Sequence, residues 1–548
     1  MDYNLRPFGA FFMKYFLIIF ILFVFSSVLV DAQELQTSPL NFEFLKYREE
    51  LLKNEKQKKE IIPAPFKYYF SDGINTSENF PLYFNLKDSG FVSPVKDQGS
   101  CGCCWAFATL GSLESSVMMR NSGVFDFSEE NMKNCHGFLM SGCSSGNHHV
   151  SVAYLTRGSG PALESQEPYI PSDNLCTAHF QPQFLVTKSY DLPKDPLVIK
   201  NAIMENGGVY ATIYWQQNFY NFTYKTYYYT GTNEVNHAVL VTGWDDNKVI
   251  SGKTGAWIAK NSWGTGWGQN GYFYISYFDT KFLSAACVFP EFSAFKNGQT
   301  VYLHDTLGMV GSLGYGGNTA YGLVKLTAKE THSLTKVGTF INAQNTKISV
   351  EIYSGKNDES LVNRLAEINE QTCPYPGYYT FDLPVKVPIN KGEDFYVKIK
   401  YITPGYNFPV PCEYKIADYS DPHISENTSW VSSSALYWER MGAPINGKMK
   451  DVCIRAYAEI DSSSTFNGLN IYPNPNQGIF TLEFDTKQEE LISVELYDIT
   501  GKIVYKRAFV KNLGQIIQRF NFSKLPKGVY IFSLKTSTTS IKRQLLIL

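Results

Sequence analysis

The spacing of apolar residues predicts two kinds of structure along this chain. Downstream of Cys104, apolar residues recur at intervals of four, three and four, which is the period of one buried helix face; they are Ala106, Leu110, Leu113 and Val117. From about residue 301, apolar and polar residues alternate instead, as in 347–353 and 394–400. This alternation predicts half-buried strands. The chain is therefore expected to begin with a helix-bearing domain and to continue as β structure.

Pattern and composition divide the 548 residues into several segments, because one hydrophobic core does not grow to this length. A Lys/Glu-rich stretch runs from Lys46 to Glu60 within the segment 33–80. This stretch is equally consistent with a solvated linker and with a short propeptide. The segments are 33–80, a mixed α+β domain over 81–292, a β-sandwich over 300–460, a Ser-rich linker over 461–467, and a last domain over 468–548.

The N-terminus has the pattern of an export signal. Arg6 and Lys14 precede an apolar run over 15–30, and small residues follow up to Ala32. This predicts a signal peptide over 1–32, cleaved after Ala32. An uncleaved anchor is the alternative, although the run is shorter than the about 20 residues that a membrane span prefers. Export would make disulfides between the ten cysteines permissible.

Charge gives no support to a nucleic-acid partner, because 49 Lys and Arg balance 51 Asp and Glu. Three short stretches carry the chemistry instead: 98–107, 236–239 and 260–264. A cysteine nucleophile needs an imidazole beside it and gains from a helix N-terminus beneath it. Cys104, His237 and Asn261 can supply the nucleophile, the base and the group that orients the base.

The order Cys, His, Asn and the surrounding residues resemble the papain-like cysteine proteases, as do 94–97, 127–130 and 264–272. The resemblance implies a two-lobed α+β protease domain with its cleft between the lobes. It also implies that the Gln98 amide helps to bind the oxyanion and that Trp263 shields the bond between His237 and Asn261. Substrate would be bound along the cleft by Ser145, Gly146, Asn236 and Trp263.

The resemblance implies two disulfides, Cys101–Cys143 and Cys135–Cys176, and leaves the pairing of Cys287, Cys373, Cys412 and Cys453 open. Family members usually have Ser or Ala where this chain has Cys103. Either Cys103 simply replaces another small residue, or a reversible disulfide between Cys103 and Cys104 silences the enzyme under oxidation.

The two later domains carry resemblances of their own. Residues 302–305 and 314–316 resemble the start of a lectin-like domain, which would either bind carbohydrate or support the protease. In the last domain, 471–475, 494–498 and 525–530 resemble the C-terminal sorting domain of the type IX secretion system. Such domains are small β-sandwiches, so the type IX machinery is an expected partner. An ordinary immunoglobulin-like module is the alternative.

Together these features predict a secreted cysteine endopeptidase that hydrolyses extracellular proteins through a thioester on Cys104. Two alternatives stay open at this point: a silent protease fold serving a surface binding protein, and a peptide ligase that passes the acyl group to an amine. No cofactor is expected. No metal is expected either, because the adjacent His148 and His149 have no Cys or acidic partner at ligand spacing.

Overall fold

The structure is a computed structural model that describes residues 34–53, 60–71, 79–120, 122–176, 180–296, 298–442, 449–460, 470–486, 490–511, 514–535 and 540–548. The predicted signal peptide and linker lie outside these ranges. No helix in the described ranges is long and apolar enough to cross a membrane. The helices are α2 (Phe42–Leu52), α3 (Cys104–Met119), α4 (Glu129–Cys135), α5 (His148–Thr156), α6 (Pro196–Asn206) and a 3-10 turn (Gln217–Phe219).

Helix α3 begins at Cys104, as the apolar spacing predicts, but it is buried on every side rather than on one face. All its residues from Cys104 to Val117 are buried, including serines between the apolar positions. These hydroxyls bond to nearby backbone carbonyls: Ser112 Oγ donates to Gly208 O at 2.5 Å, and Ser115 Oγ to Phe91 O at 2.7 Å. A polar side chain tolerates full burial when it is hydrogen-bonded in this way, so α3 runs through the interior of the protease domain.

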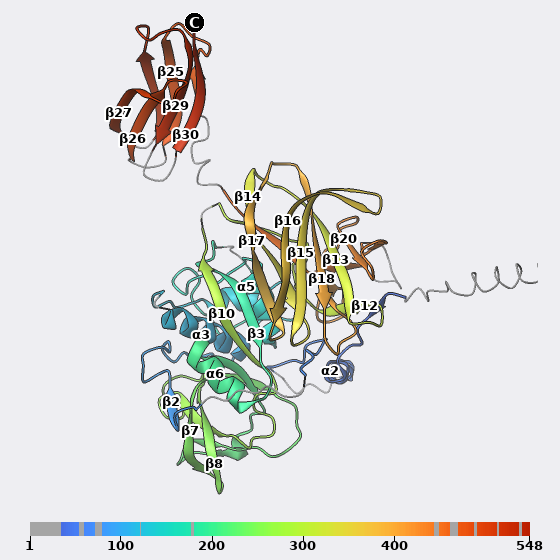
Figure 1. The fold of residues 1–548 in the computed structure, drawn as a ribbon. Helices are drawn as coiled ribbons and strands as arrows, with labels where there is room; N and C mark the ends of the chain where they lie inside the picture. The colour runs from blue at the N-terminus through green and yellow to red at the C-terminus, as the bar shows by residue number, and fades with distance from the viewer. Residues whose placement is uncertain are drawn as a thin grey trace, which may run out of the picture.

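The strands of the protease domain form one continuous sheet with four strands of the central β domain, β11, β14, β17 and β23 (Figure 1). Its order is β11-β23-β14-β17-β3-β10-β4-β7-β8-β9-β6-β5, and β2 pairs with β7. The bounds are β2 (Tyr83–Asn85), β3 (Phe184–Asp191), β4 (Val209–Ile213), β5 (Tyr220–Asn221), β6 (Thr226–Tyr227), β7 (His237–Ile250), β8 (Lys253–Lys260), β9 (Tyr272–Ser276), β10 (Ala286–Ala294), β11 (Thr300–Tyr302), β14 (His332–Ile341), β17 (Gly377–Ile389) and β23 (Ile454–Glu459).

The central β domain adds two further sheets. A six-stranded sheet has the order β16-β15-β18-β13-β20-β21, and a four-stranded sheet has the order β1-β12-β19-β22. The bounds are β1 (Gln36–Thr37), β12 (Gly311–Gly314), β13 (Thr319–Thr327), β15 (Thr346–Asn357), β16 (Ser360–Cys373), β18 (Asp394–Ile402), β19 (Val410–Tyr414), β20 (Ser429–Ser432), β21 (Glu439–Arg440) and β22 (Lys450–Val452). The alternation over 347–353 and 394–400 falls in β15 and β18, where alternate residues are buried, as predicted.

The last domain forms two sheets around a hydrophobic core of its own, which includes Phe480, Val494 and Phe532. The sheet orders are β24-β25-β28 and β27-β26-β29-β30. The bounds are β24 (Asn470–Tyr472), β25 (Ile479–Thr486), β26 (Glu490–Tyr497), β27 (Ile503–Lys511), β28 (Gly514–Asn521), β29 (Gly528–Lys535) and β30 (Ser540–Ile547). Helices followed by strands, and then two all-β domains, give the fold class that the sequence predicts.

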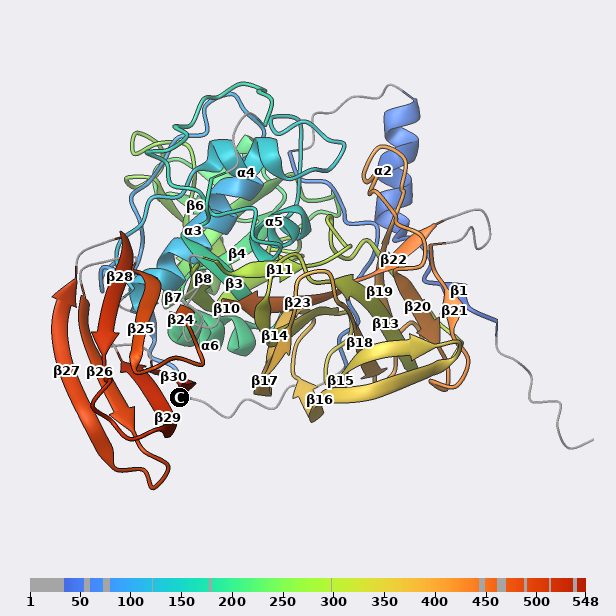
Figure 2. The same ribbon diagram turned by 90° about the horizontal axis from the view of Figure 1, so that it is seen from above.

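Residues 34–53 and 60–71, called the N-terminal segment from here on, pack against the central β domain. Strand β1 pairs with β12, and the ring of Phe44 on α2 meets Tyr419 edge-on at 5.4 Å between centroids. Further along, Tyr69 exchanges backbone hydrogen bonds with Asn342 and Gln344. Figure 2 shows α2 on the side of the central β domain, away from α3. The N-terminal segment is therefore anchored on the β domain at both of its described ends.

Candidate active site

Cys104 is held at the first turn of α3 by the loop before it. The disulfide Cys101–Cys143 forms as expected, and Gly102 N donates to Cys143 O at 3.0 Å. An alanine at position 102 would place its Cβ 2.8 Å from that same oxygen, so this close approach requires glycine. The second expected disulfide, Cys135–Cys176, also forms, while Cys287, Cys373, Cys412 and Cys453 are free thiols.

His237 and Asn261 meet because of the antiparallel pairing of β7 with β8. Strand β7 begins at His237, and Leu240 pairs with Lys260, the last residue of β8. His237 Nε2 lies 2.8 Å from Asn261 Oδ1. Because the amide oxygen can only accept, Nε2 carries the hydrogen and Nδ1 presents its lone pair when the ring is neutral. The ring of Trp263 stacks on the imidazole at 4.7 Å between centroids, as the predicted shield would.

Gln98 lies in the same site with its side-chain amide fixed at both ends. Its Oε1 accepts from Ser262 Oγ at 2.6 Å, and its Nε2 donates to Cys101 O at 2.9 Å. The same Nε2 lies 3.3 Å from Glu60 Oε2. With the Glu60 carboxylate in place, Nε2 donates to Glu60 and to Cys101, so the oxyanion role of Gln98 stays a prediction.

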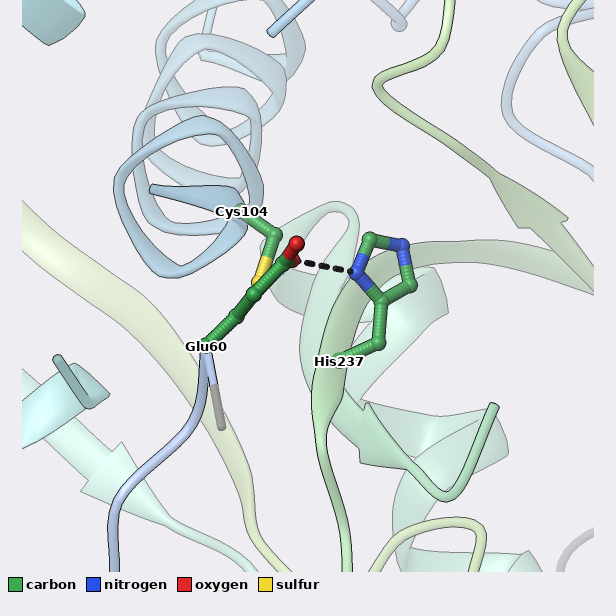
Figure 3. A group of neighbouring side chains, drawn as sticks. All are labelled: Glu60, Cys104 and His237. Carbon is green, nitrogen blue, oxygen red and sulfur yellow. Dashed lines mark hydrogen bonds and ion pairs between the residues drawn. The ribbon is translucent and has the colours of Figure 1, made fainter. Parts of the chain in front are cut away.

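Glu60, which sequence reasoning did not select, places its carboxylate between the thiol and the imidazole (Figure 3). Its Oε2 lies 3.4 Å from His237 Nδ1, and one ligand-type atom from each of Glu60, Cys104 and His237 lies within 4.8 Å of the others. The residue belongs to the N-terminal segment, far from the motifs in sequence. No local pattern marks it, because its neighbours form a Lys/Glu-rich run.

Backbone pairing holds Glu60 in this position. Gly146 N donates to Glu60 O at 3.0 Å, and Ile62 N donates to Gly146 O at 3.1 Å, in a parallel bridge. The N-terminal segment thus occupies the backbone groups of Gly146, where substrate was expected to bind. Gly146 itself packs on Trp105, whose ring would be 2.4 Å from a Cβ at this position.

The electrostatics of this arrangement differ from the sequence expectation. Burial, reinforced by the Glu60 carboxylate, raises the pKa of Cys104 well above its usual value. Burial opposes ionisation of Glu60, but hydrogen bonds and the charge of His237 more than compensate, and the pKa of Glu60 is lowered. The helix dipole was expected to favour a Cys104 thiolate. While Glu60 lies beside the imidazole, its carboxylate carries the negative charge and Cys104 stays a neutral thiol.

Cys103 is the N-cap residue of α3 and is fully buried, with its Sγ 3.2 Å from the hydroxyl of Tyr169. Burial raises the pKa of Cys103 to about 12. Cys103 and Cys104 are both free thiols. An oxidation-sensitive cysteine needs an accessible thiol of low pKa, so the environment favours the reading of Cys103 as a small buried residue.

The remaining predicted binding residues take different positions. Ser145 is buried, and the Asn236 side chain accepts from Trp215 N at 2.6 Å and donates to Trp215 O at 2.9 Å. Asn236 thereby holds the Trp215 backbone beside β7.

A cavity of about 590 Å³ adjoins the N-terminal segment next to the active site, and its lining includes Ile62, Phe66, His149 and Tyr210. His148 and Asp191 also line it, and His148 Nε2 lies 2.5 Å from Asp191 Oδ1. His148 therefore has an acidic partner, but one that lies 43 residues away and not at ligand spacing in the sequence. Asp191 ends β3, and sequence spacing does not show that α5 packs against that strand.

Comparisons with known proteins match each of the three folded domains. Residues 80–288 match the model of the papain family of cysteine proteases, 301–458 match the lectin-like domain, and 470–548 match the secretion system C-terminal sorting domain. Cathepsin J of Mus musculus is 31% identical over 207 residues, which are 37% of this chain and 62% of cathepsin J. Cathepsin K of Gallus gallus is 33% identical over 204 residues, which are 36% of this chain and 59% of cathepsin K. The matched region thus spans less than two thirds of either relative.

A solved structure shares the fold of two of the domains together. It contains the cysteine protease and lectin-like domains of Cwp84, a surface-layer-associated protein of Clostridium difficile. The TM-score is 0.68 at 22% sequence identity, over 78% of this chain and 98% of that one.

Proposed function

Because residues 80–288 form a papain-family cysteine protease domain, we propose that this chain is an exported cysteine endopeptidase that hydrolyses peptide bonds in extracellular proteins. The observation that carries the proposal is the set Cys104, His237 and Asn261, with the imidazole fixed by a 2.8 Å hydrogen bond and Cys104 at a helix N-terminus. A silent scaffold would have no need to keep this geometry.

The reaction begins when His237 Nδ1 takes the proton of Cys104 and the sulfur attacks the substrate carbonyl carbon. The resulting oxyanion is bound by Gln98 Nε2 and by the backbone N–H of Cys104. The C–N bond breaks as His237 returns the proton to the leaving amine, which leaves a thioester on Cys104. Water, activated by the same imidazole, then hydrolyses the thioester and restores the thiol. Asn261 keeps the ring aligned through both steps.

A synthetic peptide assay in the presence of an added amine tests hydrolysis against acyl transfer. The proposal predicts products with a free carboxylate and no turnover by Cys104→Ser. Mainly amine-capped products would favour a ligase. A folded, activated protein that turns over no peptide would favour a silent scaffold.

The N-terminal segment acts, in this proposal, as a short inhibitory propeptide. Glu60 occupies the space between nucleophile and base, and Glu60 and Ile62 bond to Gly146 along the substrate wall. A substrate cannot bind there while the segment is in place. Cleavage within 33–80 would therefore activate the enzyme.

The other parts of the chain would, in this proposal, direct its export. A signal peptide would direct the chain to the periplasm, and the C-terminal sorting domain would deliver it to the type IX machinery for release or surface attachment. Deletion of the residues after Ser464 should leave the protein in the periplasm. Normal secretion of this truncated chain would refute the route.

The lectin-like domain serves, in this proposal, as a brace for the protease. Its β17 pairs with β3 of the protease through Tyr378↔Ser189, and its Arg455 is buried against the protease. Arg455 Nη1 donates to Thr156 Oγ1 of α5 at 2.8 Å. A glycan array on the full chain would test whether the lectin-like domain also binds carbohydrate.

A further inference from the structure

We propose that Glu60, Cys104 and His237 form a binding site for a zinc ion that locks the N-terminal segment over the catalytic pair. The inference rests on the proposed latency of this enzyme and adds a ligand to it. Three different parts of the chain supply the three side chains: the N-terminal segment, the start of α3 and the start of β7.

The ligand types are the ones that Zn²⁺ selects in proteins: a cysteine sulfur, an imidazole nitrogen and a carboxylate oxygen. Their candidate ligand atoms lie within 4.8 Å of one another, and Glu60 Oε2 is 3.4 Å from His237 Nδ1. Bonds of about 2.0–2.3 Å in tetrahedral directions put ligand atoms roughly 3.3–3.7 Å apart. An ion could therefore enter with small side-chain shifts.

The surrounding hydrogen bonds already orient the ligands. A metal-bound histidine usually donates its other N–H to a carbonyl or carboxylate. His237 does so through Nε2 to Asn261 Oδ1 at 2.8 Å, which leaves Nδ1 directed at Glu60. Gln98 Nε2 supports the Glu60 carboxylate at 3.3 Å. Asn261 and Gln98, which would serve catalysis, therefore also orient His237 and Glu60 as metal ligands.

Charge balance favours the ion. On binding, the Cys104 thiol releases its proton to solvent and the sulfur becomes a thiolate ligand, so one thiolate and one carboxylate neutralise the two positive charges of zinc. Cys104 is fully buried and the His237 side chain is 3% exposed, whereas the Glu60 side chain is 35% exposed. A water molecule can reach the fourth position from the Glu60 side.

The second cluster of potential ligands in the described residues, His148, His149 and Asp191, supplies a control. His148 Nε2 and Asp191 Oδ1 are 2.5 Å apart, the distance of a direct hydrogen bond. Two ligand atoms of one tetrahedral zinc ion stand farther apart than that, by about 1 Å. We therefore expect no zinc between these residues, and His149→Phe should leave metal binding unchanged.

The test is Co²⁺ and Zn²⁺ titration of the full chain after removal of metal by a chelator. Co²⁺ is the spectroscopic probe, because a thiolate ligand gives it a charge-transfer band. The wild type and His149→Phe should bind one equivalent with this band. Cys104→Ser should lose the band, and Glu60→Gln, which keeps the side chain's size, should weaken Zn²⁺ binding by at least about tenfold.

Two outcomes would overturn the proposal: no thiolate band in the folded wild type, or equal zinc affinity in the wild type and Glu60→Gln, which would mean that the catalytic pair alone holds the metal. Neither outcome touches the proposed protease function. That function is read separately, by peptide cleavage in the presence of chelator after the N-terminal segment has been removed.

Discussion

At the scale of single residues, the orientation of the imidazole depends on Asn261. We expect Asn261→Ala to lower kcat/KM of the activated enzyme by about 10–100-fold, because a hydrogen bond to a group that becomes charged is worth roughly 1.5–3 kcal/mol. The matched control is Asn247→Ala, an exposed position on the same strand as His237. The measurement is kcat/KM for peptide hydrolysis by each of the two variants. Equal losses in the two variants would contradict the assigned role.

Oxidation gives a second residue-level prediction, at Cys103. Because Cys103 is buried and its pKa is raised to about 12, we expect Cys103→Ser to leave the oxidation sensitivity of the activated enzyme unchanged. The measurement is activity after peroxide treatment and after subsequent reduction. Loss of reversible inactivation in Cys103→Ser alone would restore the disulfide hypothesis.

His136 makes the stability of the protein depend on pH. Burial, followed by the charge of Arg157, lowers the pKa of His136 to about 3, and the neutral ring accepts from Phe138 N at 2.9 Å. The unfolded chain binds this proton below about pH 6.5 and the folded chain only near pH 3, so stability falls as pH decreases between these values. The difference between the two pKa values means that His136 alone lowers the free energy of unfolding by up to about 5 kcal/mol over this pH range.

His136→Asn keeps an acceptor for Phe138 N but removes the titration. Urea unfolding at several pH values should show a shallower loss of stability between pH 6.5 and pH 3 for the variant than for the wild type. Parallel curves would show that His136 is not the group responsible.

At the scale of elements, a buried ion cluster ties the start of the protease domain to α3 and α4. Lys96 Nζ lies 2.9 Å from Glu129 Oε1 and 3.5 Å from Glu114 Oε1, and both glutamates are buried. Lys96→Met would remove the cation that contacts both carboxylates directly, so we expect a destabilisation of about 3–5 kcal/mol in chemical unfolding. The exposed pair Lys415–Asp421 is the control, because its loss should cost no more than about 1 kcal/mol. A similar effect of Lys96→Met and Lys415→Met would contradict the assignment.

The elements also show what could be predicted from sequence. The start of α3, the alternation in β15 and β18, and the hydrogen bond between His237 and Asn261 could be predicted, because hydrophobic periodicity and sequence motifs carry that information. Glu60 and the partnership of His148 with Asp191 could not, because each depends on long-range packing that no local pattern records. The burial of α3 on all sides was missed because its serines look like solvent-facing residues until their backbone partners are known.

At the scale of the whole molecule, the protease and the lectin-like domain share one sheet, and the N-terminal segment spans both. A protease fragment ending at residue 292 would lose the pairing of β17 with β3 and would expose a sheet edge. We expect fragment 34–292 to be largely insoluble or to unfold at a lower temperature than fragment 34–460. The soluble fraction and thermal unfolding of the two fragments measure this. Equal behaviour would mean that the β domain does not brace the protease.

In the proposed mechanism, Cys104 is an activated nucleophile that Glu60 and the N-terminal segment hold inactive. The most direct test is labelling by an epoxysuccinyl-type inhibitor, followed by peptide mass mapping, in metal-free buffer. We expect slow labelling of the intact chain, rapid labelling at Cys104 after the N-terminal segment is removed, and no labelling in His237→Ala. Equal labelling before and after removal would contradict the inhibition by Glu60, and absence of label on the folded, activated protein would contradict the protease function itself.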